Sequence, residues 1–127
     1  MTRDLMNTAE TKDIVRRAYR AIDRSTAAVA RKLYRPEDLA QLPRSAIDRA
    51  LGVANPLRFA EVPPGDVVLD IGCGGGIDTI LAARRTGPDG RVIALDFLPE
   101  MLERTAAAAA EAGLGNVEPL ESDMEDI

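Results

Sequence analysis

The clearest hydrophobic pattern lies in the second half of the chain, where short apolar runs alternate with stretches of helical periodicity. Val67 to Ile71 is apolar except for one acid, and apolar positions then recur at helical spacing from Ile77 onward. A glycine cluster at 72–76 joins the two stretches. The pattern predicts a buried strand, a tight turn and a helix from Asp78 to about Arg85.

The same alternation continues along the chain. A second strand is predicted at Arg91 to Phe97, and Pro99 occupies the first position of a helix that ends at Gly113. A third strand is predicted at Val117 to Glu121. A helix that connects two strands in so short a unit makes a right-handed crossover, which gives a parallel sheet. Because Pro119 cannot donate to a ladder, we expect the third strand at the sheet edge.

The N-terminal third is predicted to consist of helices. Its first helix has one apolar face with charged residues opposite, formed by Ile14, Val15, Ala18, Tyr19 and Ile22. Shorter helices are expected over Ala27 to Leu33, from Pro36, and over Pro43 to Gly52. Such short helices cannot enclose a core of their own. We therefore predict an α/β fold in which residues 1–55 form a helical cap packed on a Rossmann-like parallel sheet of residues 56–127.

Composition narrows the possible functions. The chain has 127 residues, of which 46% are hydrophobic and 29% charged, as in an ordinary globular domain. Its net charge is −5 and its arginines are dispersed, so neither a nucleic-acid nor a membrane partner is expected. With one cysteine and no histidine, the sequence predicts neither a disulfide framework nor a metal site nor a histidine-based triad. Since no signal-like or membrane-spanning apolar run occurs, we expect a cytoplasmic protein.

The spacing of the glycines distinguishes between ligands. A dinucleotide fingerprint requires a small residue where this chain has Ile77, and a P-loop requires a lysine, whereas none follows Lys32. The remaining pattern is D-x-G-x-G-x-G, formed by Asp70, Gly72, Gly74 and Gly76. Taken alone, such a turn could equally serve only to pack a strand against a helix. The acids farther along the chain favour a ligand site.

Asp96 is the first of these acids. It ends the second predicted strand, 24 positions after Gly72, where a carboxylate can accept hydrogen bonds from both hydroxyls of a ribose. Phe97 beside it could cover an adenine face, and Met101 could close the pocket. The alternative is that Asp96 caps the helix that starts at Pro99.

The glycine pattern resembles the first motif of class I S-adenosylmethionine-dependent methyltransferases. The resemblance implies that the turn contacts the methionine end of S-adenosylmethionine. It also implies that Asp123 accepts a hydrogen bond from the adenine amino group and that the Met124 backbone N–H contacts the ring. The alternative for Asp123 is a solvated acidic run that includes Glu121, Glu125 and Asp126.

A longer stretch, from Leu42 to the end of the chain, resembles the N-terminal half of arsenite methyltransferases. Those proteins usually carry L-G-C-G-N-P, whose cysteine helps to hold trivalent arsenic, whereas this chain has Val53 and Ala54 in place of the Cys-Gly pair. The lone Cys73 lies inside the glycine turn and is interpreted as a small filler. Because arsenic binding needs several thiolates, the resemblance supports the cofactor site and argues against arsenite as the substrate.

The sequence therefore predicts the cofactor-binding half of a methyltransferase that acts on a small-molecule acceptor. The alternative is a non-catalytic module that binds S-adenosylmethionine or a protein partner. No catalytic residue is assigned, because in this family the residues that select the acceptor usually follow a fourth strand. The family order 3-2-1-4-5-7-6 also leaves the edge of the first strand unpaired, so we expect a homo-oligomer or a second chain that supplies the missing strands.

Overall fold

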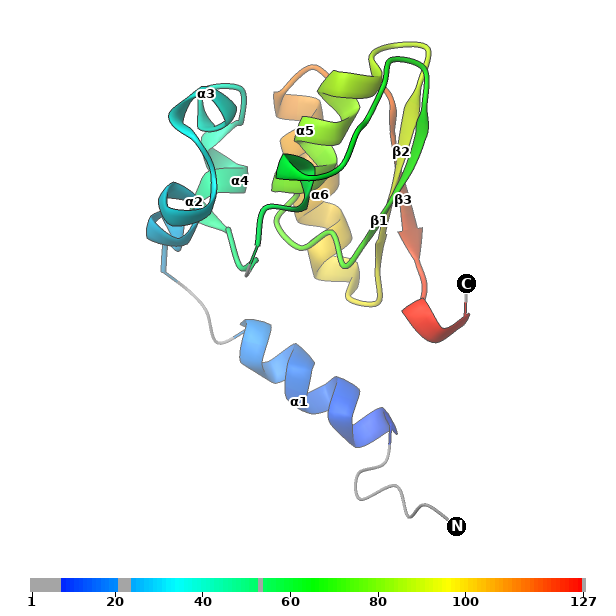
Figure 1. Ribbon diagram of the computed structural model, residues 1–127. Helices are drawn as coiled ribbons and strands as arrows, with labels where there is room; N and C mark the ends of the chain where they lie inside the picture. The colour runs from blue at the N-terminus through cyan, green and yellow to red at the C-terminus, as the bar shows by residue number, and fades with distance from the viewer. Residues whose placement is uncertain (1–7, 21–23, 53, 127) are drawn as a thin grey trace.

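A three-stranded parallel sheet forms the centre of the fold in the computed structural model, which describes residues 8–20, 24–52 and 54–126 (Figure 1). The strands β1 (Val67–Ile71), β2 (Arg91–Asp96) and β3 (Val117–Glu121) are ordered β1-β2-β3. The predicted α/β, Rossmann-like fold is confirmed, and so is the edge position of the third strand. The second strand ends one residue earlier than predicted, before Phe97.

Two helices cover one face of this sheet. They are α5 (Ile77–Thr86) and α6 (Pro99–Glu111), and α5 begins one residue before the predicted position. Ile80 of α5 and Val92 of β2 are fully buried in the core between these layers. As predicted, α6 ends just before Gly113, which has a φ of +73° and so stops the helix at low cost.

The N-terminal segment forms four helices in the described residues, namely α1 (Thr8–Arg20), α2 (Ala27–Leu33), α3 (Pro36–Leu39) and α4 (Arg44–Asp48). The predicted extension of the fourth helix to Gly52 is wrong. Its end is closed by the N–H groups of Arg49 and Ala50, each donating to a carbonyl three residues earlier, which tightens the last turn. The predictions for Ile22 and Val53 lie outside the described residues.

The cap helices α2 to α4 pack on α5 and α6, so the expected packing on the sheet is wrong. Figure 1 shows three layers in the order cap, helix pair, sheet. Ala30 and Ala46 of the cap are fully buried in one core with Ile80 and Leu81 of α5. This arrangement arises because α5 is apolar on both sides and can pack against the cap as well as against the sheet. As predicted, α2 to α4 have no separate core, and they share one core with α5 and β2.

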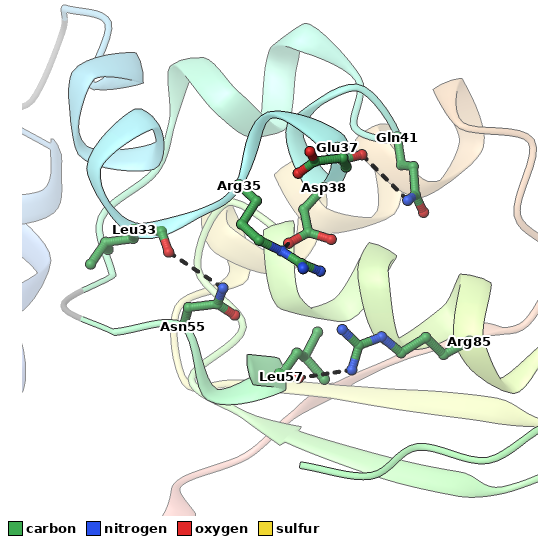
Figure 2. Close-up of polar contacts among 8 residues, drawn as sticks. All are labelled: Leu33, Arg35, Glu37, Asp38, Gln41, Asn55, Leu57 and Arg85. Atoms are coloured by element: carbon green, nitrogen blue, oxygen red, sulfur yellow. Dashed lines mark hydrogen bonds and ion pairs between the residues drawn. The ribbon is translucent and has the colours of Figure 1, made fainter. Parts of the chain in front are cut away.

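Side-chain bonds to backbone carbonyls hold the cap and the segment that follows it in place. Figure 2 shows Arg85 of α5 donating from Nη1 to the Leu57 carbonyl at 2.8 Å, and Asn55 donating from Nδ2 to the Leu33 carbonyl at 3.3 Å. Outside that view, Arg84 Nε donates to the Gln41 carbonyl at 2.9 Å. The Asn55 bond satisfies the carbonyl at the end of α2, which has no intrahelical partner, and the Arg84 bond joins α5 to the cap.

The prediction that β1 is buried is wrong for the described chain. Val67, Leu69 and Ile71 are 58%, 43% and 48% exposed, whereas Val68, which points toward the helices, is half-buried. β1 is an edge strand, and among the described residues no helix covers the far face of the sheet, as Figure 1 shows. In the part of the chain that the structure describes, every helix is too short or too polar to span a lipid bilayer.

Candidate functional site

The glycine turn forms an open cradle at the carboxyl end of β1. Gly72, Gly74 and Gly76 have φ values of +74°, +54° and +98°, a region that residues with a Cβ rarely adopt. A Cβ at Gly72 or Gly74 would meet no atom within 4 Å, so both positions face open space. The N–H groups of Gly72 and Cys73 donate to the Leu95 carbonyl at 2.8 and 3.0 Å and so fasten the turn to β2. The backbone can therefore approach a ligand closely.

This open space is a cavity of about 560 Å³ over the carboxyl ends of β1 and β2. Its walls are the glycine turn, α1, the end of the cap, and the residues that follow β2 and β3. A volume of this size is typical of small-molecule sites, and the carboxyl ends of parallel strands are where such sites lie in α/β sheets. The cavity thus offers a site for a ligand the size of a nucleoside derivative.

Asp96 is buried on the cavity wall and holds the turn in place. Its Oδ2 accepts a hydrogen bond from the Gly74 N–H at 3.3 Å, and its Oδ1 accepts one from the Leu98 N–H at 3.0 Å. The N-cap of α6 is Leu98, so Asp96 supports the start of that helix without capping it. Because each carboxylate oxygen has two lone pairs, Asp96 keeps the capacity to accept hydroxyl protons from a ligand. Its contact with a ribose stays a prediction.

Asp70 supports the turn from behind. It does not appear among the described residues that line the cavity, and its Oδ2 accepts a hydrogen bond from the Thr79 hydroxyl at 2.6 Å. Burial raises the pKa of Asp70, the bond from Thr79 opposes that rise, and the charge of Asp96 adds to it. The bond ties β1 to the first turn of α5. Direct contact of Asp70 with the cofactor stays a prediction.

The remaining predicted site residues all line the cavity, namely Phe97, Met101, Asp123 and Met124. Met101 is buried and Met124 is 63% exposed. Asp123 accepts a hydrogen bond from the Glu125 N–H at 3.1 Å and forms an ion pair with Lys12 of α1. Mainly through its bond with Lys12, the pKa of Asp123 lies below its usual value. Lys12 therefore brings α1 to this end of the cavity.

A pair of residues outside the sequence predictions also lies on the cavity wall. The Tyr34 hydroxyl donates to Asp78 Oδ1 at 2.5 Å, and both residues line the cavity. Burial raises the pKa of Asp78 to about 6; the Tyr34 bond opposes this rise, and the charge of Asp70 adds to it. Burial also raises the pKa of Tyr34. Asp78 lies two residues after the last glycine of the motif, so its position could have suggested a role at the site. Tyr34 lies 44 residues from Asp78, and no local signal in the sequence links the two.

Cys73 is buried within the turn, as expected for a small filler. Its Sγ accepts a hydrogen bond from the Thr105 hydroxyl at 3.4 Å, and that hydroxyl also donates to the Gly74 carbonyl at 2.9 Å. Burial raises the pKa of Cys73 to about 12, so the thiol stays protonated near neutral pH. Within the described ranges no three His, Cys, Asp or Glu side chains are grouped as metal ligands.

Comparisons with known proteins point to one family. Residues 63–127 match a family described as a methyltransferase domain. An arsenite methyltransferase of Halobacterium salinarum is 41% identical over 97 residues, which cover 76% of this chain and 25% of that protein. A solved arsenic(III) S-adenosylmethionine methyltransferase from Chlamydomonas reinhardtii is 29% identical, with a TM-score of 0.60 over 70% of this chain and 31% of that one.

A solved S-adenosylmethionine-dependent methyltransferase from Aquifex aeolicus is 27% identical, with a TM-score of 0.53 over 80% of this chain and 49% of that one. This chain therefore spans between a quarter and a half of the length of these three relatives. The family match covers about half of the chain and includes the sheet, the glycine turn and most of the residues that line the cavity. The chain belongs to the methyltransferase-domain family and has the fold of the class I Rossmann-like methyltransferases.

Proposed function

We propose that this chain binds S-adenosylmethionine in the cavity over β1 and β2. The observation that carries the proposal is the pair of glycines, Gly72 and Gly74, that face open space at positive φ beside the buried carboxylate of Asp96. The turn would hold the methionine end and Asp96 the ribose. Phe97 and Met101 would enclose the adenosine, and Asp123 with Met124 would meet the adenine.

We further propose that the bound cofactor serves methyl transfer to a small-molecule acceptor. When bound, S-adenosylmethionine supplies a methyl carbon made electrophilic by its sulfonium. The residues of this chain would fix that end of the ligand against the glycine turn and exclude water with α1 and the cap, since orientation accounts for much of the barrier reduction in such displacements. No catalytic base is assigned. A complete enzyme would include strands that this chain lacks, supplied by another chain or by a longer protein.

Calorimetry on the whole chain tests cofactor binding. We expect both S-adenosylmethionine and S-adenosylhomocysteine to bind, and Asp96→Ala to weaken both at least about tenfold, because a carboxylate bonded to hydroxyls is lost. If neither ligand gives heat or raises the melting temperature, the proposed function fails. Methyl transfer to an acceptor in a lysate would support the enzyme, whereas binding without transfer under all conditions would favour a non-catalytic module.

Arsenite is not the acceptor that we propose. The sequence has a single cysteine, and the structure buries its thiol in the turn, bonded to Thr105 and with a pKa raised to about 12. Arsenite binding requires several accessible thiolates. Arsenite-dependent formation of methylated arsenic by the purified chain would overturn this part of the proposal.

We also propose that β1 pairs with a second copy or with a chain that carries further strands. The support is the exposed apolar side chains of Val67, Leu69 and Ile71 on a strand that forms the sheet edge. No proline or lysine interrupts this edge, in contrast to β3 with Pro119. Light scattering after size exclusion tests the pairing: a monomer at all concentrations would contradict it.

We also propose that the protein is located in the cytoplasm, and cell fractionation tests this location.

A further inference from the structure

The cavity walls carry more negative than positive charge. Among the described lining residues the acids are Asp78, Asp96, Asp123 and Glu125, and the one cation is Lys12, which pairs with Asp123. Asp96 is bonded to two backbone N–H groups. Asp78 is therefore the half-buried acid on the wall whose charge has no cation or backbone donor among the described residues.

Asp78 is held at a fixed position by a neutral donor. Tyr34 is 7% exposed, and its hydroxyl donates to Asp78 Oδ1 at 2.5 Å. No described residue donates to the other oxygen, Oδ2, and Asp78 lines the cavity. The raised pKa of Tyr34 keeps the phenol protonated, so this donor persists through the neutral range. A carboxylate so placed can accept a charge-assisted hydrogen bond from a cationic ligand group.

The order in which the acids follow the strands indicates which cationic group of the ligand would meet Asp78. Asp123 and Met124 follow β3, Asp96 follows β2, and Asp78 lies in the first turn of α5 beyond the glycine turn. A ligand with its adenine near Asp123 and its ribose near Asp96 directs its amino-acid end toward the glycine turn and Asp78. That end carries an ammonium group as well as a carboxylate. The ammonium group would supply the positively charged donor that Asp78 lacks among the described residues.

We propose that Asp78, positioned by Tyr34, accepts a hydrogen bond from the ammonium group of the amino-acid end of S-adenosylmethionine and S-adenosylhomocysteine. The inference rests on the proposed function. It gives Tyr34 the part of a positioning residue, because its hydroxyl donates to the carboxylate that would bind the ammonium group. The cap would then contribute to cofactor recognition through one side chain, in addition to closing the cavity.

A pair of ligands isolates this contact. One is S-adenosylhomocysteine and the other is its deaminated analogue, in which hydrogen replaces the amino group. For the unmodified chain we expect the analogue to bind about 10- to 100-fold more weakly, because a hydrogen bond between charged groups is lost. In Asp78→Asn the ratio of the two dissociation constants should fall to below about threefold. A ratio measured within one variant does not depend on the fraction of protein that is folded.

Two further variants distinguish a positioning role of Tyr34 from a nonspecific effect of changing the cavity wall. Tyr34→Phe keeps the carboxylate and removes its donor, so the ratio should fall to an intermediate value. Tyr19→Phe removes the hydroxyl of another tyrosine on the cavity wall and should leave the ratio unchanged. Asp96→Asn should weaken both ligands by the same factor, because the ribose is common to them.

The outcomes distinguish the two proposals. If the unmodified chain binds neither ligand, the proposed function fails. If it binds both with equal affinity, or if Asp78→Asn leaves the ratio at its original value, the inference about Asp78 fails and cofactor binding stands. If Tyr34→Phe and Tyr19→Phe change the ratio equally, Tyr34 is not a positioning residue.

Discussion

The two faces of the sheet differ in how they are covered. On one face α5, α6 and the cap form successive layers, and Ile80 and Val92 are fully buried. On the other face Leu69 and Ile71 are nearly half exposed, although both are as apolar as their counterparts. The comparison shows that apolar residues in a strand predict that its side chains tend to be buried. The local sequence does not determine which element, if any, covers them.

The largest difference between the faces should appear in core truncations. Ile80→Ala should lower the free energy of unfolding by about 2–5 kcal/mol, because it leaves a cavity in a packed core. Leu69→Ala removes a half-exposed side chain and should cost roughly 1 kcal/mol or less. Urea denaturation of both variants measures the difference. Equal losses would mean that another copy of the chain covers the open face in solution.

A smaller effect is expected from the half-buried carboxylate of Asp78 on the covered side. The pKa of Asp78 is about 6 in the folded chain, against 3.8 for an unperturbed aspartate, so its ionised form disfavours folding above pH 6, and this penalty disappears as the pH falls from about 6 to 4. Asp78→Asn should therefore stabilise the chain at pH 8 by about 1–3 kcal/mol, and by less at pH 5. Thermal melts at both pH values measure the change.

Asp89→Asn is the control for that experiment, because Asp89 is exposed. It should shift the melting temperature little at either pH. A loss of stability in Asp78→Asn at pH 8 would show that the bond from Tyr34 outweighs the cost of burial. Stabilisation together with the lost ligand discrimination described above would mark Asp78 as a residue whose charge serves binding at the expense of folding.

The open edge should respond to charge more than to truncation. Leu69→Lys places a positive charge on the exposed face of β1, and we expect it to weaken self-association by at least about tenfold while the fold is retained. Light scattering over a range of concentrations measures the association. Ala107→Lys adds the same charge on the exposed side of α6 and should leave it unchanged. Identical behaviour of the two variants would contradict pairing through β1.

The smallest effect concerns Lys12, which bridges α1 and Asp123. If the adenine amino group approaches Asp123, it competes with Lys12 for the same carboxylate. Lys12→Gln should therefore strengthen the binding of S-adenosylhomocysteine, by no more than about fivefold, since exposed ion pairs are weak. Calorimetry at low and high salt measures the change, and Arg17→Gln, from an exposed pair on the same helix, serves as control. Weaker binding in Lys12→Gln would show that Lys12 supports the ligand.

The sequence by itself determined the elements that local patterns encode. The alternation of apolar runs with helical periodicity located the three strands and both crossover helices to within about one residue. The glycine spacing predicted the tight turn, and the structure shows positive φ at Gly72, Gly74 and Gly76, which only glycine adopts at low cost. Pro119 placed β3 at the edge, since its missing N–H cannot join a ladder.

Only the tertiary structure decided what meets across long sequence separations. Nothing local to Tyr34 indicates that its hydroxyl reaches Asp78, and the short cap helices gave no sign that they pack on α5 and α6. Exposure of Leu69 likewise depends on which layers are present on each side of the sheet. Side-chain partners and burial are fixed by the packing of whole elements, whereas periodicity and turn chemistry act within a few residues.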